Sequence, residues 1–150
     1  MILGLVVGKF YPPHYGHKLL IDTARDQCDH LVVILPHHPA QVIPGELRQA
    51  WLREIHPTAE IHLVADELDN DSRQWADFTL ARLGRAPDVV FTSETYGPQY
   101  AAFMGAKHVM VDQPRATVPI SATKIRAAPL EHLHLLQPCV RAYFVRRIVL

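Results

Sequence analysis

The stretch that decides the fold is ILGLVVGKFYPPHYGHKLLI, which runs from Ile2 to Ile21. Its apolar start predicts a buried strand over Ile2–Phe10, and the spacing that follows predicts a helix over Gly16–Cys28. Between them stand two prolines and His14, and a second histidine, His17, follows at the start of the helix. A strand that turns directly into a helix is typical of α/β proteins, and such turns often carry the ligand-binding site.

Outward from this stretch, apolar runs and helical segments alternate. We expect further strands over His30–Leu35, Glu60–Ala65, Asp88–Thr92 and His108–Val111. We expect helices over Pro44–Ile55, Ser72–Leu83, Pro98–Met104, Ser121–Ala128, Leu130–Leu136 and Cys139–Ile148. The alternation predicts an α/β fold, a Rossmann-like doubly wound parallel sheet of about five strands with a helical C-terminal segment. Residues after the first and fourth strands should lie where such a sheet binds its ligand.

The composition fits a single domain over residues 1–150 and argues against some classes of function. Apolar residues make up 49% of the chain and charged residues 20%, as in globular proteins. Lys and Arg balance Asp and Glu at 15 each, so no basic field for nucleic acid is expected. No stretch resembles a membrane span or a secretory signal, and the two cysteines form no CxxC pair. We therefore expect a cytoplasmic protein with no membrane partner.

The turn GKFYPPHYGH admits three interpretations from its residues alone. A phosphate site is one, since Gly8 allows close approach of a ligand, Gly16 opens a helix that attracts anions, and imidazoles donate hydrogen bonds. A zinc site completed by His37 and His38 is the second. The third is a plain proline-bent turn with surface histidines. The usual GxGxxG and GxxxxGK[ST] phosphate motifs are absent here, so these residues leave all three open.

Two motifs at opposite ends of the chain carry a resemblance that separates these interpretations. HYGH, at positions 14–17, matches the HxGH motif of the nucleotidylyltransferase superfamily. ISATKIR, over Ile120–Arg126, is similar to that superfamily's second signature, ISSTKIR, with Ala122 as a small-for-small departure. In that superfamily these residues bind the triphosphate of a nucleotide, and a substrate phosphate attacks the α-phosphorus directly. The resemblance therefore favours the phosphate site.

Over nearly its whole length the chain resembles the adenylyltransferase domain of NadR-type proteins, which acts on nicotinamide mononucleotide (NMN). The stretches that carry this resemblance are GKFYPPHYGH, FTSETYGPQYA, HVMVDQPRATVPISATKIR and VRAYFVRRI. It implies ATP and NMN as small-molecule partners, NAD⁺ and pyrophosphate as products, and Mg²⁺ carried by the ATP phosphates as cofactor. It also implies a fused ribosylnicotinamide kinase domain after Leu150 in the native protein. Oligomeric state stays open, a homo-oligomer included.

The resemblance also implies roles for individual residues. The catalytic residues would be His14, His17, Lys124 and Arg126. The ATP-binding residues would be Gly8, Lys9, Phe10, His14, His17, Ser93, Glu94, Ser121, Thr123, Lys124 and Arg126, with Tyr96 and Gly97 continuing the loop. The NMN-binding residues would be Lys9, Arg48, Asn70, Asp71 and Trp75. Arg48 would face phosphate and Trp75 would stack on the nicotinamide ring, although packing in the core beside Phe78 also explains Trp75. No residue of the chain is expected to ligate a metal.

Two other functions stay open at this point. One is a different HxGH adenylyltransferase, such as one with a phosphopantetheine acceptor, against which Trp75 and TSETYG argue. The other is a sensor domain that binds NAD or ATP without catalysis. The sequence also does not rank NMN against nicotinic acid mononucleotide, because a single hydrogen bond to the carboxamide would decide between them.

Overall fold

The computed structural model describes residues 1–112 and 115–149, and side chains as far as Arg146. The described residues form a five-stranded parallel sheet in the order β3-β2-β1-β4-β5. The strands are β1 (Leu3–Val7), β2 (His30–His37), β3 (Glu60–Ala65), β4 (Val89–Thr92) and β5 (Lys107–Met110). The helices are α1 (Tyr15–Asp26), α2 (Gly45–Ile55), α3 (Ser72–Leu83), α4 (Gly97–Phe103), α5 (Ala122–Ala127), the 3₁₀ helix η1 (Pro129–Leu135) and α6 (Pro138–Val149). The predicted Rossmann-like α/β fold is confirmed.

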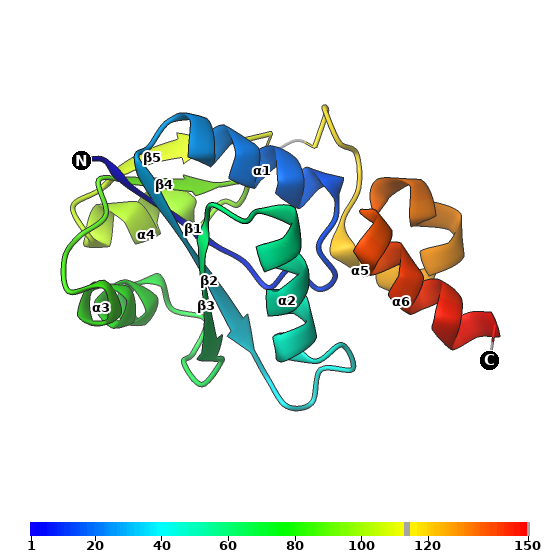
Figure 1. Cartoon of the computed structure of the whole chain (residues 1–150). Coiled ribbons are helices and arrows are strands. Elements are labelled where there is room, and N and C mark those ends of the chain that lie inside the picture. The colour runs from blue at the N-terminus through cyan, green and yellow to red at the C-terminus, as the bar shows by residue number, and fades with distance from the viewer. Residues whose placement is uncertain (113–114, 150) are drawn as a thin grey trace.

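Both faces of the sheet are covered, which explains why its strands are apolar throughout. Val6 and its neighbours pack against α1 and α2 on one face, in a cluster that includes Ile21 and Leu52. On the other face, Leu5 belongs to a cluster with Ala76 of α3 and with residues of α4. The order in which strands are added to the sheet reverses between β1 and β4, so the carboxyl ends of these two parallel strands form the switch point of the sheet (Figure 1).

The C-terminal helices form a third apolar cluster beside α2, away from the sheet (Figure 1). Ile125 of α5 and Val140 of α6 are fully buried in it with Trp51 of α2. Tyr11, in the turn after β1, packs against the same cluster. The C-terminal helices are thereby brought to the turn of the first motif.

Some bounds differ from those predicted. β1 ends at Val7 and not at Phe10, because only Gly8 N continues the ladder, to Ile34 O at 3.2 Å, and Phe10 turns the backbone to a φ of 46°. η1 is a 3₁₀ helix interrupted at His132, where φ is −123°. Along residues 1–112 and 115–149, no helix combines the length and apolarity that a bilayer crossing requires.

Candidate functional site

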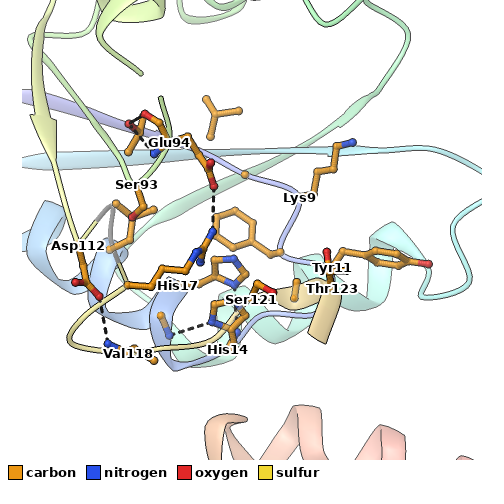
Figure 2. A pocket seen from close by; sticks show the side chains of 18 of the residues that line it. Lys9, Tyr11, His14, His17, Ser93, Glu94, Asp112, Val118, Ser121 and Thr123 are labelled. Atoms are coloured by element: carbon orange, nitrogen blue, oxygen red, sulfur yellow. Dashed lines mark hydrogen bonds and ion pairs between the residues drawn. The ribbon is translucent and has the colours of Figure 1, made fainter. Parts of the chain in front are cut away.

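Two cavities adjoin at the carboxyl end of β1. The first, of about 530 Å³, lies over the switch point and is lined by the turn after β1, the loops after β4 and β5, and the start of α5 (Figure 2). The second, of about 480 Å³, lies toward β3 and α3. Both are lined by Gly8, Lys9 and Tyr96, so a ligand that filled both would pass over the end of β1. The residues expected to bind ATP that line the first cavity are Gly8, Lys9, Phe10, His14, His17, Ser93, Glu94, Ser121, Thr123 and Arg126.

His14 and His17 begin α1 as a capping box. Nδ1 of the N-cap residue His14 accepts from Gly16 N at 3.0 Å, and Nδ1 of His17 accepts from His14 N at 3.2 Å. The two rings stack, with centroids 3.7 Å apart (Figure 2). Because each Nδ1 accepts a hydrogen bond, each neutral ring carries its hydrogen on Nε2. Each ring is therefore an N–H donor through Nε2.

Both imidazoles are held in the neutral form. Burial, and after it the charge of Arg115, lower the pKa of His14 to about 4. Burial, then His14, then Arg115 lower the pKa of His17 well below its usual value. His14 Nε2 is buried without a hydrogen-bond partner in the described part of the chain. An unsatisfied buried donor is costly, so this atom is a candidate donor to a ligand, and a phosphate oxygen fits as the acceptor.

Gly16 and Phe10 support the two rings. A Cβ on Gly16 would lie 2.7 Å from Cε1 and 2.9 Å from Nδ1 of His14, so only glycine leaves this ring in place. Phe10, which we expected to contact ATP, is 1% exposed, and its ring meets that of His17 edge-on at 4.8 Å. Phe10 thus forms the floor beneath His17.

The second motif reaches the first cavity through α5. Ser121 is the N-cap of this helix and accepts from Lys124 N at 3.3 Å. Thr123 and Arg126, three residues apart on one face of the helix, both line the cavity. Lys124 is rotated away from that face, is exposed and lines neither cavity. The structure therefore does not bring Lys124 to the expected catalytic position.

Arg48 has a different environment from the one expected. It is 0% exposed, lines neither cavity and donates from Nη1 to Lys9 O at 2.6 Å. Its other donors go to Gln41 Oε1 at 2.6 Å and Ile43 O at 3.2 Å. These three acceptors fix the guanidinium, so in this structure Arg48 holds the first-motif turn and lines neither cavity.

Arg115 is a cation at the site that sequence reasoning did not find. It lines the first cavity, donates to Ile120 O at 3.0 Å and pairs with Glu94 at 3.4 Å. Asp112, also missed, shapes the loop by accepting from the backbone of Ala116, Thr117 and Val118. These hydrogen bonds, that from Thr117 first, lower the pKa of Asp112. The available signal was a single arginine placed between the fifth strand and ISATKIR.

The loop after β4 carries Ser93 and Glu94. Ser93 Oγ donates to Val111 O at 2.5 Å, which ties this loop to the end of β5. Glu94 faces the first cavity as the partner of Arg115 (Figure 2). Tyr96 follows it and lines both cavities; burial, with the charge of Glu94, raises the pKa of its phenol to about 12. Tyr96 is therefore an uncharged side chain at the border of the two cavities.

The second cavity contains most of the residues expected to bind NMN. Asn70 and Trp75 line it together with Lys9, whose Nζ lies 3.7 Å from Asp66. Trp75 is half-buried and meets Phe78 edge-on at 5.6 Å, so it both packs on the core and presents a face to the cavity. Asp71 does not line the cavity, because it is the N-cap of α3 and accepts from Arg73 N at 2.8 Å.

The zinc interpretation required His37 and His38 beside the motif histidines. Within residues 1–112 and 115–149, no three or more His, Cys, Asp or Glu side chains are grouped to hold a metal ion. His37 and His38 line neither cavity, and His38 Nδ1 accepts from Ala40 N at 3.0 Å.

A parallel sheet whose switch point holds a cavity with neutral imidazole donors and arginines defines an α/β nucleotide-binding domain. The model of the cytidylyltransferase-like family matches residues 5–128, and the chain belongs to that family. This places it in the nucleotidyltransferase class to which the two sequence motifs pointed.

Relatives place the chain nearer to one group. It is 29% identical to the trifunctional NAD biosynthesis/regulator protein NadR of Escherichia coli (strain K12), over 99% of this chain and 42% of that protein. A crystal structure of NadR in complex with NR matches 91% of this chain and 43% of that one, with a TM-score of 0.68 and 21% identity. Another, in complex with NAD and AMP-PNP, matches 92% and 45%, with a TM-score of 0.65 and 22% identity. The predicted resemblance to NadR-type proteins is confirmed, and the chain spans about two-fifths of that relative.

Proposed function

We propose that this chain is an adenylyltransferase that joins the AMP moiety of ATP to NMN and releases NAD⁺ and pyrophosphate. The observation that carries the proposal is the pair of cavities that meet over Gly8 and Lys9. Two nucleotides that react through their phosphates need two separate pockets with a shared centre. The NadR relatives support the proposal, since one is named for NAD biosynthesis and another was solved with NAD and AMP-PNP.

The first cavity suits the triphosphate of ATP. His14 and His17 offer neutral Nε2–H donors, while Arg115 and Arg126, from the C-terminal part of the sequence, bring positive charge. The α-phosphorus would lie at the border of the two cavities, where an oxygen of the NMN phosphate attacks it and pyrophosphate departs into the first cavity. Such a transfer needs positioned donors and charge neutralisation and no protein nucleophile. This explains a site built of imidazoles and guanidinium groups.

Magnesium fits this site as an ion carried by the substrate. The described residues offer no group of three or more metal-ligating side chains, and Mg²⁺ commonly keeps several waters while it bridges phosphates. When bound, it would add to the neutralisation of charge on the phosphates. The residues of the chain then orient the phosphates and hold the N–H donors in place.

The second cavity suits a cationic pyridine ring. Trp75 presents an aromatic face there, and Asn70 offers an amide beside it. Among its described lining residues Lys9 is the only cationic one, and it already pairs with Asp66. Glu67, Asp69 and Asp71 add negative charge to the same loop. A carboxylate on the pyridine ring would be repelled, so we expect the carboxamide form, NMN, to be preferred over its acid analogue.

The deciding experiment measures pyrophosphate release by the 150-residue chain with Mg-ATP and one of three acceptors: NMN, nicotinic acid mononucleotide or phosphopantetheine. We expect release with NMN. Release with phosphopantetheine alone would overturn the choice of acceptor. Binding of ATP or NAD without release for any acceptor would instead support the sensor function. Whether a ribosylnicotinamide kinase domain follows in the native protein stays a prediction, which sequencing of the native gene beyond Leu150 tests directly.

A further inference from the structure

Tyr11 belongs to the first-motif turn, yet the proposed chemistry gives it no role. Its ring, hydroxyl and carbonyl contact three separate segments of the chain. The ring lies 5.1 Å from the guanidinium carbon of Arg48 and 4.5 Å from that of Arg126. The carbonyl accepts from Arg126 Nη1 at 2.5 Å, and the hydroxyl accepts from Val42 N at 2.8 Å. One side chain thus joins α2, the loop before it, and α5.

Arg126 depends on Tyr11 for its orientation. It is exposed, and it projects from a helix of only six residues. In the described part of the chain, its polar and ring contacts are the two with Tyr11, the ring and the carbonyl. An exposed arginine has many rotamers of similar energy, and fixing one costs conformational entropy. The contacts with Tyr11 select the rotamer that places Arg126 in the lining of the first cavity.

Tyr11 is itself fixed from the other side. Arg48, fully buried and bound to Lys9 O and Gln41 Oε1, lies over the same ring. The hydrogen bond from Val42 N holds the phenol end. A cation within about 6 Å of a ring face is attracted to it, so both arginines favour the observed ring position. The buried Arg48 therefore fixes the position of the Tyr11 ring, and the ring in turn fixes the orientation of the exposed Arg126.

We propose that Tyr11 is a positioning residue that couples the two motifs by holding Arg126 toward the first cavity, ready for the polyphosphate of a nucleoside triphosphate. The inference rests on the proposed function only in taking ATP as the ligand of that cavity, and it needs no assumption about the acceptor. A merely structural Tyr11 would fill the apolar cluster beside Ile125 and would not affect Arg126 specifically.

The test is a double-mutant cycle on ATP binding, measured by isothermal titration calorimetry with Mg-ATP and the 150-residue chain, without acceptor. Tyr11→Leu removes the ring and should weaken ATP binding by about 3- to 10-fold. Tyr11→Phe keeps the ring and should stay within about 2-fold of the wild type. In an Arg126→Ala background, Tyr11→Leu should cause little further loss, because the residue that it positions is gone.

Phe144→Leu is the matched control, since it also replaces an aromatic residue by leucine in the same cluster. It should lower the melting temperature and leave ATP binding unchanged. Equal losses of affinity for Tyr11→Leu and Phe144→Leu, or an undiminished effect of Tyr11→Leu without Arg126, would overturn the proposal. If Tyr11→Leu does not fold, as judged by circular dichroism, Tyr11→Met enters the same cycle with the same two deciding outcomes.

The outcomes also separate this inference from the proposed function. A wild-type chain that binds ATP and shows the coupling, but releases no pyrophosphate with NMN, refutes the proposed function and supports the role of Tyr11. A wild-type chain that does not bind ATP refutes both.

Discussion

Replacement of Gly16 by alanine tests whether the position of the His14 ring, and not the stability of α1, matters for function. Gly16 is the second residue of α1. Alanine is normally the better helix former by about 1 kcal/mol, so on propensity alone the variant should be more stable. The new Cβ, however, would lie 2.7 Å from His14 Cε1 and 2.9 Å from Nδ1. The ring must move, and the hydrogen bond from Gly16 N to Nδ1 is lost or distorted.

The magnitudes of these effects predict a separation of stability from activity. Loss of an N-cap hydrogen bond costs about 1 kcal/mol, which roughly offsets the gain in helix propensity. The melting temperature should therefore change by no more than about 4 °C. A displaced donor at a site of developing charge costs about 100-fold in rate, and so does a shift of about 1 Å in a reacting group. Gly16→Ala should thus lower kcat/KM for ATP by about two orders of magnitude.

The assay pairs pyrophosphate-release kinetics with thermal unfolding, and Gly84→Ala serves as the control. Gly84 ends α3 with a φ of 72°, and a Cβ there meets nothing within 4 Å. Alanine in that left-handed conformation costs about 1–2 kcal/mol, so this control should lose stability and keep activity. We therefore expect Gly16→Ala to lose activity and keep its stability, and Gly84→Ala to lose stability and keep its activity. A Gly16→Ala variant that keeps full activity would refute the argument that the His14 ring must stay where glycine leaves it.

Four further predictions concern charge and specificity. The pKa of folded His14 is about 4 and that of the unfolded residue 6.5, so the unfolded chain binds more protons between these values. The free energy of unfolding should therefore fall as the pH drops from 6.5 toward 4, and chemical denaturation of His14→Gln should show a smaller slope. Arg115→Ala should raise KM for ATP by about 10-fold or more, since hydrogen bonds to charged groups contribute about 1.5–3 kcal/mol. The same variant should raise the pKa of His14 in an NMR titration, because the neighbouring cation is gone. Trp75→Ala should raise KM for NMN by about 10-fold and leave KM for ATP nearly unchanged, whereas Trp75→Phe should recover much of the loss; equal effects on both substrates would favour a purely structural tryptophan. Turnover with NMN should exceed that with nicotinic acid mononucleotide by about 10-fold, and Asp66→Asn should narrow the gap in paired steady-state assays.

The sequence predicts what local pattern controls. Apolar runs such as His30–Leu35 mark buried strands because a parallel sheet covered on both faces needs them, and β2 forms there. The order of strands and helices then fixes which loops meet at the switch point, so the loop carrying Ser93 and Glu94 could be placed from the sequence. The order of the sheet itself confirms that placement.

The roles of the cations depend on tertiary contacts that no local pattern encodes. Arg48 and Arg126 are both arginines on short helices, yet the first is fully buried and the second exposed. Arg48 donates to Lys9 O, 39 residues away, and Arg126 donates to Tyr11 O, 115 residues away, so neither environment follows from the neighbouring residues in the sequence. Arg115 was missed for the same reason, since its place is revealed by tertiary contacts such as its pairing with Glu94 and its effect on the pKa values of the two histidines.

The histidines of the HxGH motif both begin a helix and offer hydrogen-bond donors to the first cavity. His14 at the N-cap and His17 three residues later close the capping box, and Gly16 leaves room for the first ring. Using both Nδ1 atoms to start the helix leaves both Nε2 atoms as donors, and burial keeps the rings neutral. A serine or aspartate would cap α1 equally well, but its side chain would have no second nitrogen to offer to a phosphate. Histidine at both positions therefore fits the proposed phosphate ligand, since the helix alone would not require it.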